Sequence, residues 1–229
     1  MRLRAITLDL DDTLWPIRPV LIQAERALAE WLHTHAPTTA SQVGAEQRFA
    51  IRQQVMRDHP ERAFDVSFVR REGLRRAFLA AGDDADLAEE AFQVFLAARQ
   101  QVTPYPDVAQ VLARWAQRFT LIAVTNGNAD VHRTPLGPWF SGALNAPDLG
   151  CAKPDPRVFA AACARAGAAP HEVLHIGDDP ALDVAAARAA GLHALWLKRP
   201  DLAQHHSEST EPGFESLPAI DAVLHRFSG

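Results

Sequence analysis

Two aspartates, one residue apart, stand where the first apolar run of the chain ends. The run from Leu3 to Leu8 predicts a buried strand, and Asp9-Leu10-Asp11-Asp12-Thr13 follows it directly. Because side chains alternate along a strand, we expect Asp9 and Asp11 to leave the same face as neighbours. Unpaired carboxylates are costly to bury, so the pattern predicts a cation between them. A divalent metal ion is the simplest such cation.

Polar residues also follow two later apolar runs that predict strands. Thr125-Asn126-Gly127-Asn128 follows the run 119–124, and Gly177-Asp178-Asp179 follows the run 173–176, with Asp183 close behind. Lys153 stands between these two segments in the chain. In an open parallel sheet, ligands bind in the crevice at the carboxyl ends of the strands. Carboxylates for a metal, donors for an anion and a lysine to balance charge together indicate phosphoryl transfer.

The elements that must position these residues follow from the apolar pattern. Four stretches with helical spacing come first and have no strand between them: 20–35, 45–57, 66–81 and 87–101. A helix at 108–117 and then four strands separated by helices come later, with the strands at 119–124, 143–145, 173–176 and 193–197. This alternation is typical of a parallel sheet, which the first strand also needs as its partner. We therefore predict a doubly wound, Rossmann-like α/β core from residues 1–15 and 104–229, with an all-helical insertion at 16–103.

Composition excludes several classes of partner. The chain has 229 residues, 48% of them hydrophobic, and a formal net charge of −5. This acidic balance favours neither nucleic acid nor an anionic membrane surface, so we expect a small-molecule substrate. No apolar stretch reaches membrane-spanning length, and the N-terminus leaves no room for a signal peptide. Cys151 and Cys163 lack metal or disulfide spacing, so we expect free thiols and a cytoplasmic location. We also expect a monomer or homodimer.

These residues resemble the haloacid dehalogenase superfamily of phosphohydrolases. Its four motifs occur in order: DxDxT at Asp9 to Thr13, the strand-end Thr125, Lys153, and GDxxxxD from Gly177 to Asp183. The resemblance covers essentially the whole chain, including a helical cap inserted after the first motif. It implies a phosphomonoester hydrolase that depends on Mg²⁺ and acts on small phosphorylated metabolites.

The resemblance also implies a role for each residue of the acidic motifs. Asp9 would be the nucleophile that becomes an aspartyl phosphate, and Asp11 would be the general acid and base. Mg²⁺ would be held by Asp9, by the backbone carbonyl of Asp11 and by Asp178. Asp183 would orient Lys153 or a water on the metal.

Two further residues would bind the substrate's phosphate together with Lys153. Thr125 and the backbone N–H of Asn126 would hold one phosphate oxygen. Lys153 would offset the charge of the phosphate and of Asp9. An aspartate at the position of Asp11 favours ester hydrolysis over dehalogenation, because a halide leaving group needs no proton. A haloacid dehalogenase-type hydrolase and a non-catalytic phospho-accepting switch, like a receiver domain, stay open as alternatives.

A closer resemblance is to bacterial phosphatases that act on flavin mononucleotide and on the phosphorylated ribitylamino-uracil precursor of riboflavin. It rests on residues 7–14, on Arg18-Pro19-Val20, and on residues 124–128 and 175–179. His175, inside an apolar run, is expected to be a hydrogen-bonded core residue. Trp15 could touch a planar leaving group or cover the cap interface, and Arg18 could reach the cleft.

Overall fold

The computed structural model describes residues 3–199 and 209–224. It divides into two compact units, one formed by Met1–Ile17 and Val102–Gly229 and the other by Arg18–Gln101. The sequence placed the boundaries after residues 15 and 103, two residues from these positions. No helix in the described ranges is long and apolar enough to cross a membrane. Cys151 and Cys163 are buried free thiols, as expected.

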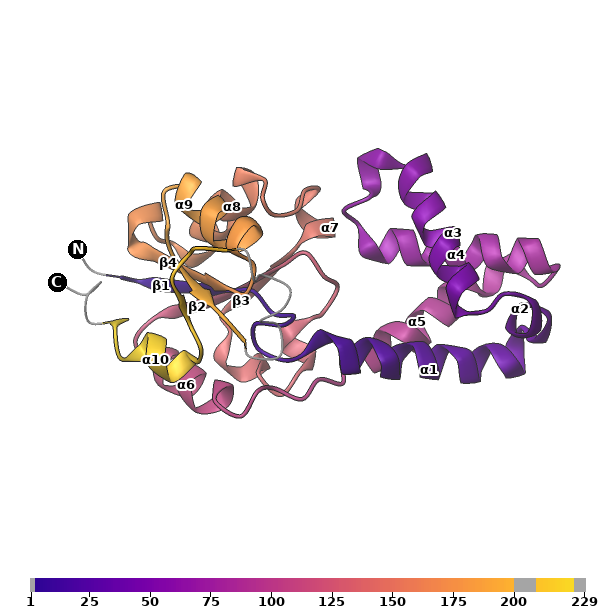
Figure 1. The fold of residues 1–229 in the computed structure, drawn as a ribbon, viewed down its shortest axis with the longest axis horizontal. Helices are drawn as coiled ribbons and strands as arrows, with labels where there is room; N and C mark the ends of the chain where they lie inside the picture. The colour runs from indigo at the N-terminus through magenta and orange to yellow at the C-terminus, as the bar shows by residue number, and fades with distance from the viewer. Residues whose placement is uncertain (1–2, 200–208, 225–229) are drawn as a thin grey trace. The chain divides into compact units, whose positions relative to one another are not determined.

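The first unit, the core unit, is built on a parallel sheet of six strands in the order β3-β2-β1-β4-β5-β6 (Figure 1). Its strands are β1 Ala5–Leu8, β2 Thr120–Thr125, β3 Gly142–Asn145, β4 Val173–Gly177, β5 His193–Leu197 and β6 Gly213–Phe214. All five ladders between neighbouring strands are parallel. The predicted doubly wound α/β fold is therefore confirmed, while the two-residue β6 was not predicted.

Strand β1 lies at the centre of the sheet, where both of its faces are buried. All four of its residues are buried, and Leu8 pairs with Ala123 of β2 and Ile176 of β4. The backbone N–H of Asp9 donates to Ile176 O at 3.0 Å, which extends the ladder by one residue. The ends of β1, β2 and β4 therefore meet at one edge of the sheet, where ligands bind in folds of this kind.

Helices cover both faces of this sheet, with α8 and α9 on one side and α6 and α10 on the other (Figure 1). Their bounds are α6 Val108–Trp115, α7 Ala146–Leu149, α8 Pro156–Ala166, α9 Ala186–Ala189 and α10 Leu217–Asp221, with a π-helical turn at Pro180–Ala185. Phe159 of α8 and Ala187 of α9 pack with Val173 and Trp196 of the sheet. On the opposite face, the indole N–H of Trp115 donates to Asp221 at 2.7 Å and joins α6 to α10.

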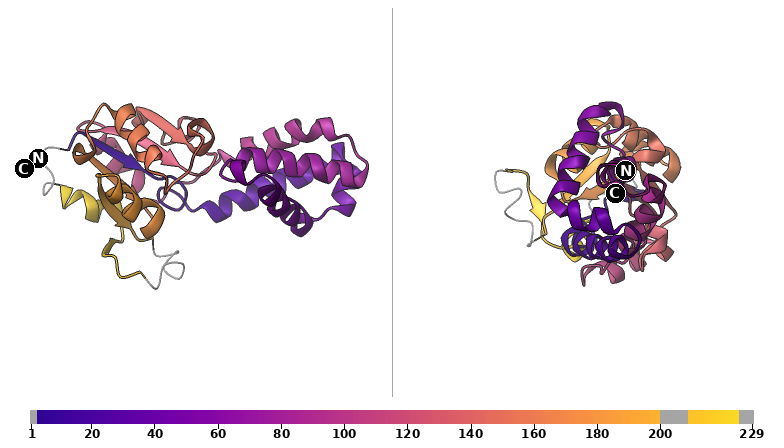
Figure 2. Two further views of the ribbon diagram at one scale, coloured as in Figure 1. Left: turned by 90° about the horizontal axis from the view of Figure 1, so that it is seen from above. Right: turned by 90° about the vertical axis from the view of Figure 1, so that its right-hand side faces the viewer.

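The second unit, the helical unit, contains α1 to α5 (Figures 1 and 2). Their bounds are α1 Ile17–His35, α2 Pro37–Gln42, α3 Ala45–Asp58, α4 Val66–Ala81 and α5 Ala88–Arg99. The expected start of the first helix at residue 20 was wrong. Pro19 lies in the first turn of α1, where a missing N–H is tolerated, and the Asp12 carboxylate accepts from the Ile17 N–H at 2.9 Å.

The apolar stripes of these helices face one another. Leu28 and Leu32 of α1, Phe78 of α4, and Phe92 and Phe95 of α5 are all buried in one cluster. The aromatic residues of the insertion that belong to this cluster are therefore core residues, which their helical spacing indicates.

Candidate active site

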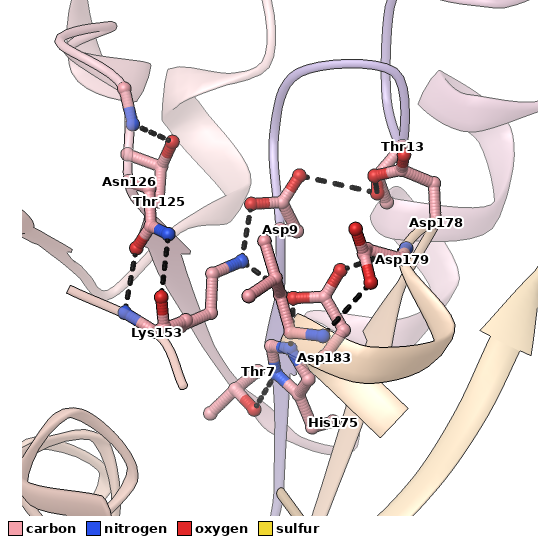
Figure 3. Close-up of polar contacts among 12 residues, drawn as sticks. Thr7, Asp9, Thr13, Thr125, Asn126, Lys153, His175, Asp178, Asp179 and Asp183 are labelled. Atoms are coloured by element: carbon pink, nitrogen blue, oxygen red, sulfur yellow. Dashed lines mark hydrogen bonds and ion pairs between the residues drawn. The ribbon is translucent and has the colours of Figure 1, made fainter. Parts of the chain in front are cut away.

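A buried lysine joins two carboxylates at the edge where β1, β2 and β4 end (Figure 3). The Lys153 ammonium donates to Asp9 Oδ1 and to Asp183 Oδ1, each at 2.6 Å. Its side chain is 3% exposed, against 10% for Asp9 and 2% for Asp183. With water largely excluded, these ion pairs are screened little and hold the three side chains in one arrangement.

The loop that carries Lys153 is tied to the end of β2 by Asn126. The side-chain amide of Asn126 donates to Lys153 O at 3.0 Å, and its carbonyl accepts from the Lys153 N–H at 2.8 Å. The family resemblance implied a role only for the backbone N–H of Asn126, so the contacts of its side chain were not predicted. The buried hydroxyl of Thr125 accepts from the Gly127 N–H at 2.9 Å, which shapes the turn after the strand.

Asp178 and Thr13 complete the acidic cluster. The Thr13 hydroxyl lies 2.9 Å from Asp178 Oδ1 and 3.3 Å from Asp9 Oδ2, so its one proton bridges the two carboxylates. The sequence placed Thr13 in the first motif without assigning it a contact. A small cavity of about 150 Å³ is lined by Asp9, Asn126, Lys153, Asp178, Asp179, Leu182 and Asp183. This volume is below that of pockets that enclose a drug-sized ligand, so the cavity suits a reacting group and not a whole metabolite.

The pKa values of the three carboxylates around Lys153 are shifted by burial and by the charges of their neighbours. Burial raises the pKa of Asp9 well above its ordinary value, although Lys153 opposes the shift. Burial, followed by the charge of Asp183, raises the pKa of Asp178 to about 7. Burial would raise the pKa of Asp183 as well, but Lys153 and His175 lower it below the ordinary value. A further cation would favour the ionised form of all three.

The donor set fits a hard divalent cation. One oxygen from each of Asp9, Asp178 and Asp183 lies within 4.8 Å of the other two. Asp183 already accepts from Lys153 and His175, so Asp9 and Asp178 are better suited as ligands. Carboxylate oxygens are the ligands that Mg²⁺ takes from proteins.

Asp11 lies in a turn beyond the strand and has a different environment. Strand β1 ends at Leu8, and Asp12 has the left-handed backbone angle φ 59°, so strand alternation does not reach Asp11. Asp11 Oδ1 accepts from the indole N–H of Trp15 at 2.9 Å. Trp15 itself is fully buried, so its ring packs in the interior and its N–H orients Asp11. The acidic cluster above forms from Asp9, Asp178 and Asp183 and does not include Asp11.

His175 is a hydrogen-bonded core residue, as the sequence predicts. It is 0% exposed, with Nδ1 2.8 Å from the Thr7 hydroxyl and Nε2 3.1 Å from Asp183 Oδ1. Through Asp183, His175 is connected to Lys153. The only sign of this connection in the sequence is that His175 is a polar residue within an apolar run.

Comparison with known proteins assigns the class of this chain. The family model of haloacid dehalogenase-like hydrolases matches residues 3–191, so the chain belongs to this family of enzymes. The resemblance drawn from the motifs is thereby confirmed.

Particular relatives differ in the activity that their names describe. The chain is 31% identical to the 5-amino-6-(5-phospho-D-ribitylamino)uracil phosphatase YigB of Escherichia coli K12, over 86% of this chain and 84% of that protein. It is 36% identical to the phosphoserine phosphatase of Thermus thermophilus over 55% of this chain and 53% of that protein. The crystal structure of a 2-haloacid dehalogenase from Pseudomonas syringae pv. Tomato DC3000 is 38% identical, with a TM-score of 0.89 over 99% of this chain and 100% of that one.

Proposed function

We propose that this protein is a Mg²⁺-dependent phosphomonoesterase that acts on small phosphorylated metabolites. The observation that carries the proposal is the excess of carboxylates around Lys153, with Asp9, Asp178 and Asp183 close together in one small cavity. A dianionic phosphate adds further negative charge, so this arrangement suits a reaction in which a divalent cation takes part. Displacement of a halide by a carboxylate makes no such demand.

In the first half of the proposed reaction, Asp9 attacks phosphorus. A bond forms between a carboxylate oxygen of Asp9 and phosphorus, and the bond from phosphorus to the ester oxygen breaks. Asp11 gives its proton to the departing oxygen, and the Trp15 indole N–H keeps Asp11 oriented for this transfer. Lys153 stabilises the charge that gathers on the phosphoryl oxygens.

In the second half, water hydrolyses the aspartyl phosphate. Asp11, now ionised, takes a proton from the attacking water, the bond between Asp9 and phosphorus breaks, and inorganic phosphate leaves. Thr125 and the N–H of Asn126 hold a phosphoryl oxygen throughout, while the Asn126 side chain keeps the Lys153 loop in place. Asp9, the carbonyl of Asp11 and Asp178 would hold Mg²⁺, which would neutralise phosphate charge and orient the phosphoryl group.

For the substrate, we propose the phosphorylated ribitylamino-uracil precursor of riboflavin or flavin mononucleotide. Support comes from the 31% identity to the Escherichia coli phosphatase named for that precursor, over most of both chains. The cavity of about 150 Å³ accounts for the phosphoryl group alone, so it does not discriminate between esters. The alternatives include phosphoserine, for which a second relative is named.

Phosphate release from p-nitrophenyl phosphate, measured with Mg²⁺ and after chelation by EDTA, tests the reaction class. We expect repeated turnover with Mg²⁺ and loss of turnover with EDTA, restored by added Mg²⁺. A single labelling event per chain would instead indicate a phospho-accepting switch. A panel of phosphate esters that includes both flavin-related compounds and phosphoserine then ranks the substrates by kcat/KM.

Dehalogenation is the second candidate, favoured by the 38% identity to the structure described as a 2-haloacid dehalogenase. Halide release from 2-chloropropionate, in the presence and absence of Mg²⁺, tests it. Halide release without phosphatase activity would reject the phosphatase proposal.

A further inference from the structure

We propose that His175 and Thr7 are positioning residues, which hold the Asp183 carboxylate so that it keeps Lys153 against the nucleophile. The inference rests on the phosphatase function proposed above and concerns buried side chains that support the reacting groups. The five side chains form one connected chain of contacts, from Thr7 through His175, Asp183 and Lys153 to Asp9 (Figure 3).

Donor and acceptor logic assigns a single proton arrangement to this chain. The Asp183 carboxylate already accepts from Lys153, so the nitrogen of His175 that faces it, Nε2, must carry the proton. A neutral imidazole then has a lone pair on Nδ1, which accepts from the Thr7 hydroxyl at 2.8 Å. Burial lowers the pKa of His175 below its ordinary value, against the opposing effect of Asp183, which agrees with a neutral ring. Asp183 therefore sets the tautomer of His175, and the Thr7 hydroxyl donates to the ring nitrogen that is left without a proton.

Asp183 is fixed from three sides. His175 and Lys153 bind Oδ1, while Oδ2 accepts from the Asp179 N–H at 3.1 Å. A Cβ at Gly177 would lie 2.2 Å from the Asp183 carboxyl carbon, so only glycine lets the carboxylate rest on the end of β4. The Phe159 and His175 rings form a T-shaped contact with their centroids 5.2 Å apart, which holds the imidazole plane.

This arrangement sets the direction of the lysine. Two of the three ammonium protons of Lys153 are directed at Asp183 and Asp9, which leaves the third for a phosphate oxygen. If Asp183 rotated away, Lys153 would lose one anchor and its ammonium could shift with respect to Asp9 Oδ1. Even a small displacement of a charged group from the reacting atoms lowers the rate strongly.

Four variants test the positioning role, with hydrolysis of p-nitrophenyl phosphate as the assay. His175→Leu removes the donor to Asp183 and should lower kcat about 10- to 100-fold, with a smaller change in KM. His175→Gln keeps an N–H donor in the same direction and should recover most of the loss. Thr7→Val should lower kcat about 2- to 10-fold, and Thr7→Ser should restore it.

The matched control is Thr120→Val, the same change on the neighbouring strand, where the side chain is half-buried and outside the chain of contacts. It should leave kcat unchanged. All rates are measured at 15 °C after circular dichroism has shown that each variant is folded. Nitrogen-15 NMR of the histidine rings gives a readout independent of activity: His175 should have its proton on Nε2 in the wild type and in Thr7→Val, and the Nδ1 resonance should shift in Thr7→Val because that nitrogen loses its hydrogen-bond donor.

The outcomes separate the two proposals. Wild-type kcat in folded His175→Leu, or equal loss in His175→Leu and His175→Gln, would overturn the positioning role and leave the phosphatase function standing. A wild-type Nδ1–H tautomer would also overturn it. If the wild type itself released no phosphate, the proposed phosphatase function would be rejected, and the positioning role, which depends on it, would be rejected as well.

Discussion

Replacing Lys153 by methionine tests the charge balance on which the candidate site depends. The ammonium lies 2.6 Å from both Asp9 Oδ1 and Asp183 Oδ1, and the lysine side chain is 3% exposed. Breaking a buried ion pair by removing one partner costs about 3–5 kcal/mol, because the other charge stays buried. Methionine fills a volume similar to that of lysine, so the substitution leaves little cavity that would lower the stability further. We expect the free energy of unfolding of the core unit to fall by this amount at pH 7.5.

Urea denaturation followed by tryptophan fluorescence measures the loss. Four of the five tryptophans belong to the core unit: Trp15, Trp115, Trp139 and Trp196. The matched control is Lys198→Met, which removes the other lysine of the chain. Lys198 lies 5.1 Å from the Trp196 ring centre, a cation–π contact worth about 0.5–1 kcal/mol at an exposed site.

At lower pH, the difference in free energy of unfolding between Lys153→Met and the wild type should become smaller. In the wild type the pKa of Asp183 is held below its ordinary value, so the stability it contributes is present above about pH 4 and is lost as the pH falls through the folded-state pKa. Without Lys153, burial raises that pKa above the unfolded value, and stability then increases as the pH falls. Two results would refute the reasoning. One is a Lys153→Met variant that is as stable as Lys198→Met at pH 7.5. The other is a difference in free energy of unfolding between Lys153→Met and the wild type that increases from pH 7.5 to pH 5.

Three further predictions concern the reaction and the helical unit. Asp9→Asn should lower kcat by at least about 10³-fold while the circular dichroism spectrum stays unchanged, because the nucleophile is lost; a few per cent of residual activity would contradict nucleophilic catalysis. Asp11→Asn should lower kcat for an alkyl phosphate by about 10²- to 10⁴-fold and less for p-nitrophenyl phosphate, whose leaving group needs little protonation; equal losses would speak against a general acid. Glu25→Gln removes the 2.6 Å ion pair with Arg70 and should lower the free energy of unfolding by about 1–2 kcal/mol at pH 7. Burial would raise the pKa of Glu25, but Arg70 and neighbouring arginines lower it overall, so this loss should shrink as the pH falls below about 4 in urea denaturation followed by circular dichroism.

The scaffold could be predicted from the sequence because burial on both faces makes the central strands nearly continuous apolar runs. β1 and β4 are buried throughout, and each run ends at a cluster of polar residues. Parallel strands bring such ends to one edge, so Asp9, Thr125 and Asp178 could be assigned to a common site before any coordinates. β6, with two residues, has no periodicity to detect.

The direction of the Asp11 side chain could not be predicted, because alternation applies only while the chain stays extended. β1 ends at Leu8, and the left-handed angle at Asp12 turns the backbone towards Trp15. The contact of Asp11 with the Trp15 indole depends on that turn. Nothing in the spacing of two aspartates specifies it.

The contacts beneath the site depend on pairings between segments far apart in the chain. Thr7 and His175 are separated by 168 positions and meet because β1 and β4 pair in one register, with Thr7 opposite His175. A shift of β1 by one residue against β4 would turn the Thr7 side chain to the other face of the sheet, away from His175. Both faces of β1 and β4 are buried, so their apolar pattern has no alternation that would specify this register, and the sequence alone could not predict which polar pair supports Asp183.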